Sequence, residues 1–400
     1  FFSHYLLLSK VKLNYLLILK FKASKCIKLP TLETLTKNLF SSDDSFVSIS
    51  GNDLQNKKTI DIFCLQIYDN FVSNHKLLNE FKKYILVLPR ILILPLILNA
   101  KHYKFFSSQT FPLTKNRDRD IEHTINKTPV NLTLSNEDIK IGEEFLSKIS
   151  NGNKNIKFVI MIIRDSSYLN NYFNTANKIN SKDWSYHNFR DGNIDDYLPA
   201  CEELTKLGYY VFRMGQVVSK KIHTKNPMII DYASNGMRTE LLDIFLASKC
   251  EFCISNATGF DALAMIFRKP IIFSNYAPVA SVPSYSKKFL ITFRHHYSKK
   301  LNRRLNLKEI FDEKSAHMFE GFTNNDLILQ DNTPLELKEA ILEMESFVRN
   351  KEYENSNILN NEFWKIYSSM IKKHDLSNLH GNLVSKISAK FLERNKYLIS

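Results

Sequence analysis

Five short apolar runs alternate with helical segments in the middle of the chain, and this alternation constrains the fold more than any other feature. The runs lie at 158–163, 209–214, 228–232, 252–255 and 270–274. Helical patterns lie at 195–207, 239–248 and 260–267. Apolar runs bounded by turn residues are typical of strands buried on both faces. The order of strand and helix therefore predicts an α/β fold with a parallel sheet and right-handed crossovers.

A domain boundary is expected near residue 150, where Asn151-Gly152-Asn153 separates a capped helix at 135–149 from the first apolar run. A chain of 400 residues can hold two domains. The expected organisation is an N-terminal domain at 1–150, a sheet-containing domain at 151–350, and C-terminal helices at 351–400 that pack back on the body. Further helices are expected at 335–350, 362–373 and 384–391, and a strand at 60–67.

The charge balance favours anionic partners. The formal net charge is +14, and the segment 262–308 carries ten Lys or Arg and no Asp or Glu. Nucleic acid, phosphate groups and acidic membrane surfaces all attract such a chain. This basic segment is either a solvated face or a surface that meets the phosphates of a donor, a lipid-linked acceptor or anionic lipid.

The cysteines and the N-terminal residues bear on the compartment. Five scattered cysteines argue against a disulfide scaffold and for a reducing environment, so we expect a cytoplasmic protein. Cys250 and Cys253 lack a second ligand pair, which favours buried thiols over a zinc site. Residues 1–25 are rich in Leu but interrupted by Lys, too broken for a membrane-spanning helix. Peripheral contact with the inner face of the cytoplasmic membrane remains open.

Polar side chains follow all five predicted strands. Because the carboxyl ends of parallel strands meet at one edge of a sheet, these side chains describe the rim of a ligand site. The candidate catalytic residues are Arg164, Asp165 and Asp231. The candidate ligand-binding residues are Arg213, Gly215, Ser255, Asn256, Thr258, Gly259, Asn275 and Tyr276.

Two features of this rim suit a phosphate. Arg164 and Arg213 each follow a buried strand, where a guanidinium can hold a diphosphate through paired hydrogen bonds. The alternative for each is an ion pair with Asp165 or Asp231. The segment 255–259 joins a strand to a helix, whose N-terminal amides and dipole favour an anion. The alternative there is a helix cap and a tight turn without a ligand.

Several other sites are not supported. The chain has no G-x-G-x-x-G after a strand, no P-loop and no G-x-S-x-G, so we expect no dinucleotide cofactor. The pair Asp118-x-Asp120 lies in a charged segment outside the alternating region and is read as chance, so no metal is expected. His295-His296 lies in the basic segment and is expected to be a surface pair.

An ordered series of segments also resembles a known family. It comprises FVIMIIRDSSYL at 158–169, DYLPACEELTKLGYYVFRMG at 196–215, Asp231-Tyr232, LDIFL at 242–246 and the segment 257–275. LKEIF at 307–311, 332–334 and His380-Gly381 continue the series. These segments resemble bacterial glycosyltransferases encoded in surface-polysaccharide gene clusters. The resemblance covers residues 130–400 and rests on order and spacing rather than on one motif.

The resemblance implies a GT-B fold, in which two Rossmann-like domains face a cleft. It implies metal-independent transfer of a sugar from a nucleotide-sugar donor to a glycan or lipid-linked acceptor. Arg164-Asp165 also looks like the arginine motif of fucosyltransferase-type enzymes, in which the arginine holds the donor diphosphate. Ile162 and Ile163 stand where that motif has its preceding His. Thr258-Gly259 stands where related enzymes often carry Ser-Gly.

The competing hypothesis is a basic nucleic-acid- or lipid-binding protein without catalysis. The net charge supports it. The sequence shows no helix-turn-helix, zinc-finger or RNP motif, so nucleic acid is not the expected partner.

Overall fold

The computed structural model describes residues 62–65, 74–83, 86–89, 120–121, 123–168, 185–313, 315–317, 326–352 and 357–400. The expectations for residues 1–25 and for Asp118 lie outside these ranges.

A seven-stranded, fully parallel sheet forms the centre of the molecule, with the strand order β12-β8-β7-β6-β3-β4-β5. The strands are β3 (Phe158–Ile162), β4 (Tyr210–Arg213), β5 (Ile229–Ile230), β6 (Cys253–Ser255), β7 (Ile271–Tyr276), β8 (Phe289–Phe293) and β12 (Lys386–Ile387). The predicted α/β fold with a parallel sheet is confirmed. The chain builds outward from β3 to β5, then returns beside β3 with β6 and builds the other way. This is a doubly wound sheet whose topological switch point lies between β3 and β6.

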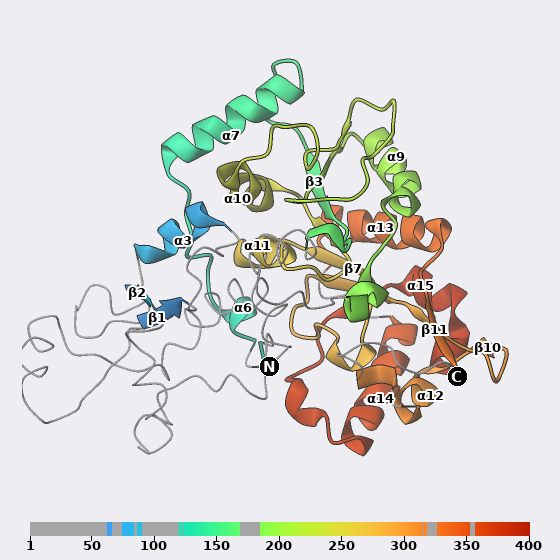
Figure 1. Cartoon of the computed structure of the whole chain (residues 1–400). Helices are drawn as coiled ribbons and strands as arrows, with labels where there is room; N and C mark the ends of the chain where they lie inside the picture. The colour runs from blue at the N-terminus through green and yellow to red at the C-terminus, as the bar shows by residue number, and fades with distance from the viewer. Residues whose placement is uncertain are drawn as a thin grey trace, which may run out of the picture.

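The apolar runs are buried on both faces because helices cover both sides of the sheet (Figure 1). In β3, Phe158, Ile160 and Ile162 point into one core, and the alternate residues point into the other. The first core is covered by α7 (Asn136–Ile149), α10 (Glu240–Lys249), α11 (Asp261–Ile266), α14 (Ile358–Lys373) and α15 (Ala389–Arg394). The second is covered by α9 (Leu198–Lys206) and α13 (Pro334–Arg349).

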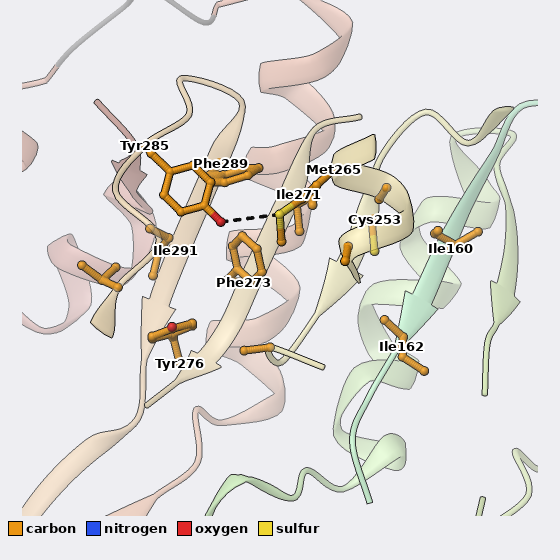
Figure 2. Packing of buried hydrophobic residues seen from close by; sticks show 14 of the residues in the cluster. Ile160, Ile162, Cys253, Met265, Ile271, Phe273, Tyr276, Tyr285, Phe289 and Ile291 are labelled. Carbon is orange, nitrogen blue, oxygen red and sulfur yellow. Dashed lines mark hydrogen bonds between the residues drawn. The ribbon is translucent and has the colours of Figure 1, made fainter. Parts of the chain in front are cut away.

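Figure 2 shows part of the first core, in which large aromatic rings fill the space above β7 and β8. Phe273 meets Phe289 edge-to-face with ring centroids 5.2 Å apart. The hydroxyl of Tyr285 reaches the sulfur of Met265 at 3.5 Å. Cys253 is buried and unpaired in the same core, as expected for a thiol on a central strand.

The helix α7 packs on the sheet although it precedes residue 150. Its capping box is present, with Ser135 Oγ accepting from the Asp138 amide and Asp138 accepting from the Ser135 amide. Gly142 has no side chain, and a Cβ there would lie 2.2 Å from the ring of Phe245 on α10. This close approach lets the ring of Phe145 pack on the ring of Phe212 on β4, with the two ring centroids 5.9 Å apart.

Upstream of α7, the described residues include a small parallel unit. β1 (Ile62–Leu65) pairs in parallel with β2 (Leu86–Pro89), and α3 (His75–Lys82) connects them. The strand expected at 60–67 is thus present. α3 packs against α10, where the amide of Lys76 donates to the Glu240 carboxylate at 3.0 Å.

The C-terminal part differs in two places from the sequence expectation. The segment 384–391 was expected to be one helix, but Ile387 pairs with Ile291 and so extends the sheet as β12. Ser388 then caps α15 by accepting from the Phe391 amide. No strand was predicted at the position of β8.

A second, antiparallel sheet follows β8. It has the order β10-β9-β11 and consists of β9 (His295–Ser298), β10 (Arg303–Arg304) and β11 (Leu327–Gln330). The remaining short helices are α6 (Thr124–Lys127), η1 (Ser185–Arg190), η2 (Ile194–Tyr197), η3 (Val279–Ser281), α12 (Leu307–Asp312), η4 (Ser315–His317), η5 (Ser377–Leu379) and η6 (Lys396–Ile399). In the described part of the chain, no helix is both long enough and apolar enough to cross a bilayer.

Candidate functional site

The loops after β3 and β6 are joined at the switch point by one buried amide. Asn256 accepts from the Arg164 amide through Oδ1 at 2.7 Å. Its Nδ2 donates to the carbonyl oxygen of Arg190 at 3.1 Å. Asn256 is only 2% exposed. A single side chain from the 255–259 loop therefore fixes the ends of β3 and η1 against each other.

Three guanidinium groups gather at this point, and we refer to Arg164, Arg190 and Arg294 as the arginine cluster. Arg190 Nη2 donates to the Ala257 carbonyl at 2.7 Å, inside the 255–259 loop. Arg294 follows β8 and donates from Nη2 to the Asp191 carbonyl at 2.5 Å. Arg164 Nη1 lies 3.2 Å from Asp191 Oδ1.

The arginine cluster crowds positive charge into a buried place. Burial and, to a smaller extent, the charge of Arg190 lower the pKa of Arg164 to about 10, against the opposing effect of Asp191 and Asp165. Burial also lowers the pKa of Arg190, against the opposing effect of Tyr276, Asp261 and Asp191. Arg164 stays cationic at neutral pH, because a guanidinium with a pKa near 10 is still protonated there.

Two carboxylates neutralise the positive charge of the arginine cluster only in part. Asp331 pairs with Arg294, and Asp191 with Arg164. Burial raises the pKa of both carboxyl groups in spite of these cations. Arg190 Nε and Arg294 Nε are buried and meet no acceptor among the described residues. Arg213 Nε, in the separate group described below, is also buried without such a partner. Buried donors are nearly always satisfied, so Arg190 Nε and Arg294 Nε are candidate contacts for a ligand at the switch point.

Gly192 permits the close packing of the cluster. Its amide donates to the Arg164 carbonyl at 3.0 Å. A Cβ at this position would lie 2.9 Å from Ile163 Cγ2 and 3.0 Å from Asn256 Nδ2. Any larger residue would push Asn256 away from the Arg164 amide.

Arg213 lies in a second, separate group one strand away. It is 1% exposed, and its Nη1 donates to Asp231 Oδ1 at 2.9 Å. Its Nη2 lies 4.0 Å from Asp165 Oδ2. The ion-pair alternative is therefore what the structure contains for Arg213, and contact with a donor diphosphate stays a prediction.

The two carboxylates around Arg213 also hold the loop that follows β4. Asp165 Oδ2 accepts from the amide and hydroxyl of Ser219, at 2.9 and 3.1 Å. Asp231 Oδ2 accepts from the Ile222 amide at 3.0 Å and from Ser234. Gly215 starts this loop with φ of +153°, which L side chains rarely adopt. Both carboxylates are fully engaged in holding backbone, which disfavours proton abstraction from a substrate.

Other predicted residues of the 255–259 loop make local contacts. Ser255 Oγ donates to Asp261 at 2.9 Å and accepts from the Ala257 amide. Thr258 Oγ1 accepts from the Phe260 amide at 3.2 Å, and Gly259 is partly exposed beside it. These are the contacts of a tight turn, and no side chain caps the helix α11 that follows it. α11 is only six residues long, so its dipole adds little to an anion site.

Asn275 and Tyr276, at the end of β7, are occupied by internal bonds. Asn275 Oδ1 accepts from the Asn332 amide at 2.6 Å, and its own amide donates to Thr292 at 3.1 Å. The Tyr276 hydroxyl donates to the Ser281 carbonyl at 2.6 Å. Both residues are buried. Asn275 links β7 to the segment just before α13, and Tyr276 links it to η3. Neither side chain lines an open surface.

The expectation of a surface pair at His295-His296 is wrong. Both side chains are buried, since β9 is the central strand of the antiparallel sheet, between β10 and β11, and the ring of His295 stacks on Phe391 of α15. His295 Nδ1 lies 2.7 Å from the Tyr397 hydroxyl, and Nε2 lies 3.2 Å from Glu336. Burial lowers the pKa of His296 to about 3. In the described ranges, no three His, Cys, Asp or Glu side chains are close enough together to hold a metal ion.

Sequence reasoning missed three contributors to the cluster. Arg294 follows the apolar run FLITF and obeys the rule that found Arg164, but the strand before it was overlooked. Arg190 is the last residue of the 3-10 helix η1 and Asp191 follows it, so neither comes after a strand and the strand-end rule could not have found them. Comparison of the chain with protein-family models, with curated proteins and with solved structures finds no match.

Proposed function

We propose that this chain is a glycosyltransferase that moves a hexosyl or deoxyhexosyl group from a nucleotide-sugar donor to a glycan or lipid-linked acceptor in surface-polysaccharide biosynthesis. One observation carries the proposal. The arginine cluster meets the 255–259 loop at the switch point of a doubly wound sheet. Sheets of this kind bind nucleotide ligands in the crevice at that point.

The chemistry of the cluster fits a diphosphate. Guanidinium groups bind phosphate oxygens through paired, charge-assisted hydrogen bonds. Arg190 Nε and Arg294 Nε offer two buried donors for this purpose. A phosphate would also relieve the crowding of cations that lowers the pKa of Arg164. The ligand with the best fit is thus the diphosphate of a nucleotide-sugar.

The transfer step follows from this placement. The bond between the anomeric carbon and the donor phosphate oxygen breaks, and the leaving diphosphate takes the electron pair. The acceptor hydroxyl oxygen forms the new bond to that carbon, and its proton passes to a base. Fixed cations aimed at the leaving group lower the barrier without a metal ion. Arg164 is the residue assigned to this role.

The structure favours a different role for the two aspartates predicted to be catalytic. Asp165 and Asp231 hold Arg213 and the loop after β4, so the acceptor base is assigned to residues 1–150. The parallel β1-α3-β2 unit is compatible with a second Rossmann-like domain there, as a GT-B arrangement requires. We place the reaction on the cytoplasmic side of the membrane, with peripheral contact to it.

Two measurements test the proposal. The first is a thermal-shift screen against UDP-, GDP-, CMP- and dTDP-linked sugars. A donor at about 100 times its Kd should add roughly 2.7 kcal/mol of stability. No response to any of them would contradict the proposal.

The second is Arg164→Ala, with the fold checked by circular dichroism. Turnover should fall on the order of 100-fold or more, because a donor to the leaving group is lost. The control is Arg349→Ala, which removes an exposed arginine of α13 and should leave turnover unchanged. Turnover of Arg164→Ala within a few-fold of wild type would remove Arg164 from the mechanism.

A further inference from the structure

The β9–β10 hairpin projects from the body of the molecule (Figure 1). β9 begins one residue after β8, so the hairpin starts at the carboxyl edge of the parallel sheet. Ser298 and Arg303 form the last pair before the tip, which consists of residues 299–302. Asn302 turns the chain with φ of +51°.

The tip combines exposed cations with an exposed aliphatic side chain. Lys299 and Lys300 are both exposed, and neither forms an ion pair with any described residue. Leu301 is 48% exposed between them and the turn. Arg303 differs from these lysines, because Glu309 neutralises it through two hydrogen bonds at 2.6 and 2.9 Å.

The outer face of the antiparallel sheet continues this surface. Ile328 on β11 lies beside Tyr297 on β9 in the strand register. Ile328 is 41% exposed, whereas its neighbour Leu327 faces the core and is buried. The tip residues Lys299, Lys300 and Leu301, together with Tyr297 and Ile328, form what we call the hairpin surface.

We propose that the hairpin surface docks the protein on an anionic bilayer. Lysines near such a surface are attracted to its headgroups, and aliphatic and tyrosine side chains settle at the boundary between headgroups and acyl chains. A nucleic acid would also attract the lysines, but it gives no favourable place to Leu301 and Ile328. The mixture of charge and aliphatic exposure therefore favours lipid.

Docking through the hairpin would bring the proposed donor site close to the bilayer, and this step of the inference rests on the proposed function. Arg294 belongs to the arginine cluster and immediately precedes β9. A docked hairpin therefore holds the carboxyl edge of the sheet close to the bilayer. A lipid-linked acceptor would reach the donor site from the membrane, so the hairpin selects acceptors that are anchored there.

The test is co-sedimentation of the full chain with two kinds of vesicle, pure phosphatidylcholine and phosphatidylcholine enriched in phosphatidylglycerol. The variants are Lys299→Gln/Lys300→Gln and Leu301→Asp. The matched controls lie on α7, namely Lys140→Gln/Lys148→Gln and Ile141→Asp, where Ile141 is 42% exposed. Each lysine contributes about 1 kcal/mol near an anionic surface, so the double lysine variant should bind the anionic vesicles roughly 25-fold more weakly. The α7 variants should bind like wild type.

Each other outcome overturns the docking proposal. Hairpin variants that sediment like wild type, or α7 variants that lose binding equally, show that the hairpin surface is not the contact. Retention on duplex DNA that depends on Lys299 and Lys300, without vesicle binding, assigns the surface to nucleic acid instead.

The nucleotide-sugar thermal shift is measured on the same variants and separates the two proposals. A donor response without vesicle binding overturns docking alone. Vesicle binding without any donor response overturns the proposed function alone.

Discussion

Arg164 and Arg213 end neighbouring strands of the same sheet, and both follow apolar runs, yet the structure gives them opposite surroundings. Arg213 has one carboxylate at 2.9 Å and a second at 4.0 Å. Arg164 has one carboxylate at 3.2 Å, and burial, Arg190 and Arg294 lower its pKa against the effect of Asp191 and Asp165. The same strand-end pattern therefore precedes an internal ion-pair clamp in one case and the proposed anion site in the other.

The balance of nearby charge decides between these two outcomes. A buried arginine with two carboxylates is compensated and stabilises the loops around it. A buried arginine beside two further arginines destabilises the folded protein. Groups that destabilise the fold in this way are common at functional sites, where a bound ligand offsets the effect. Variants of the two arginines should therefore separate an effect on stability from an effect on ligand binding.

The largest effect is expected for Arg213→Met. This variant leaves Asp231 and Asp165 without their cation, and breaking a buried pair on one side costs about 3–5 kcal/mol. The free energy of unfolding from urea titration measures the loss. Asp231→Asn should also destabilise, and the double variant should lose less than the sum of the two. A loss under about 1 kcal/mol for Arg213→Met would mean that the clamp does not hold the loop.

The opposite result, a loss of donor affinity with little change in stability, is expected for Arg164→Met. Stability should change little, because the substitution relieves repulsion from Arg190 while it removes the pair with Asp191. Affinity for the donor should fall by about 1.5–3 kcal/mol, the range for hydrogen bonds to charged groups. Titration calorimetry measures the affinity, with Arg213→Met as the comparison. Equal losses of stability in both variants would erase the distinction between the two arginines.

Sequence patterns predicted the sheet well because strands buried on both faces must be apolar along their whole length. The runs at 158–163 and 252–255 became β3 and β6, and their loops meet as parallel strands require. The prediction of one helix at 384–391 was wrong because β12 is only two residues long and forms through its pairing with β8. Such a strand has no local signal.

The site was harder to predict because its members are not defined by local pattern. Nothing in the sequence distinguishes Arg213 from Arg164, since the difference lies in which carboxylates fold back on each. Asp231 reaches Arg213 across 18 positions in the chain, and Arg190 reaches the 255–259 loop across 67. Partners at these separations are set by the fold, so only the structure could sort the arginines.

A smaller effect is expected for Gly192→Ala, which tests the packing of the arginine cluster. The new Cβ would displace Asn256 and weaken its bond with the Arg164 amide. Overpacking of this kind costs about 1–3 kcal/mol of stability, and donor affinity should fall with it. The control is Ser219→Ala, which removes one bond to Asp165 in the Arg213 group and should leave donor affinity unchanged. Unchanged affinity in Gly192→Ala would show that the exact placement of Asn256 does not matter.

The smallest effect concerns pH and distinguishes the carboxylates of the arginine cluster. Burial raises the pKa of Asp191 and of Asp331, so in the folded protein both take up protons above the ordinary carboxyl range. Their ionised forms therefore cost stability above the raised pKa, and this cost is relieved as the pH falls through it. Protonation also removes two negative charges that compete with an anionic ligand. The affinity for sulfate, which does not itself titrate here, should rise a few-fold between about pH 8 and about pH 5.

The double variant Asp191→Asn/Asp331→Asn should bind sulfate more tightly at neutral pH and show a flatter profile. Glu339→Gln, at a partly exposed position on α13 where the carboxylate pairs with Arg394, should keep the wild-type profile. A wild-type profile in the double variant would mean that these carboxylates do not face the bound anion. The arginine cluster would then be balanced internally like Arg213, and the contrast between the two arginines would have to be explained by position alone.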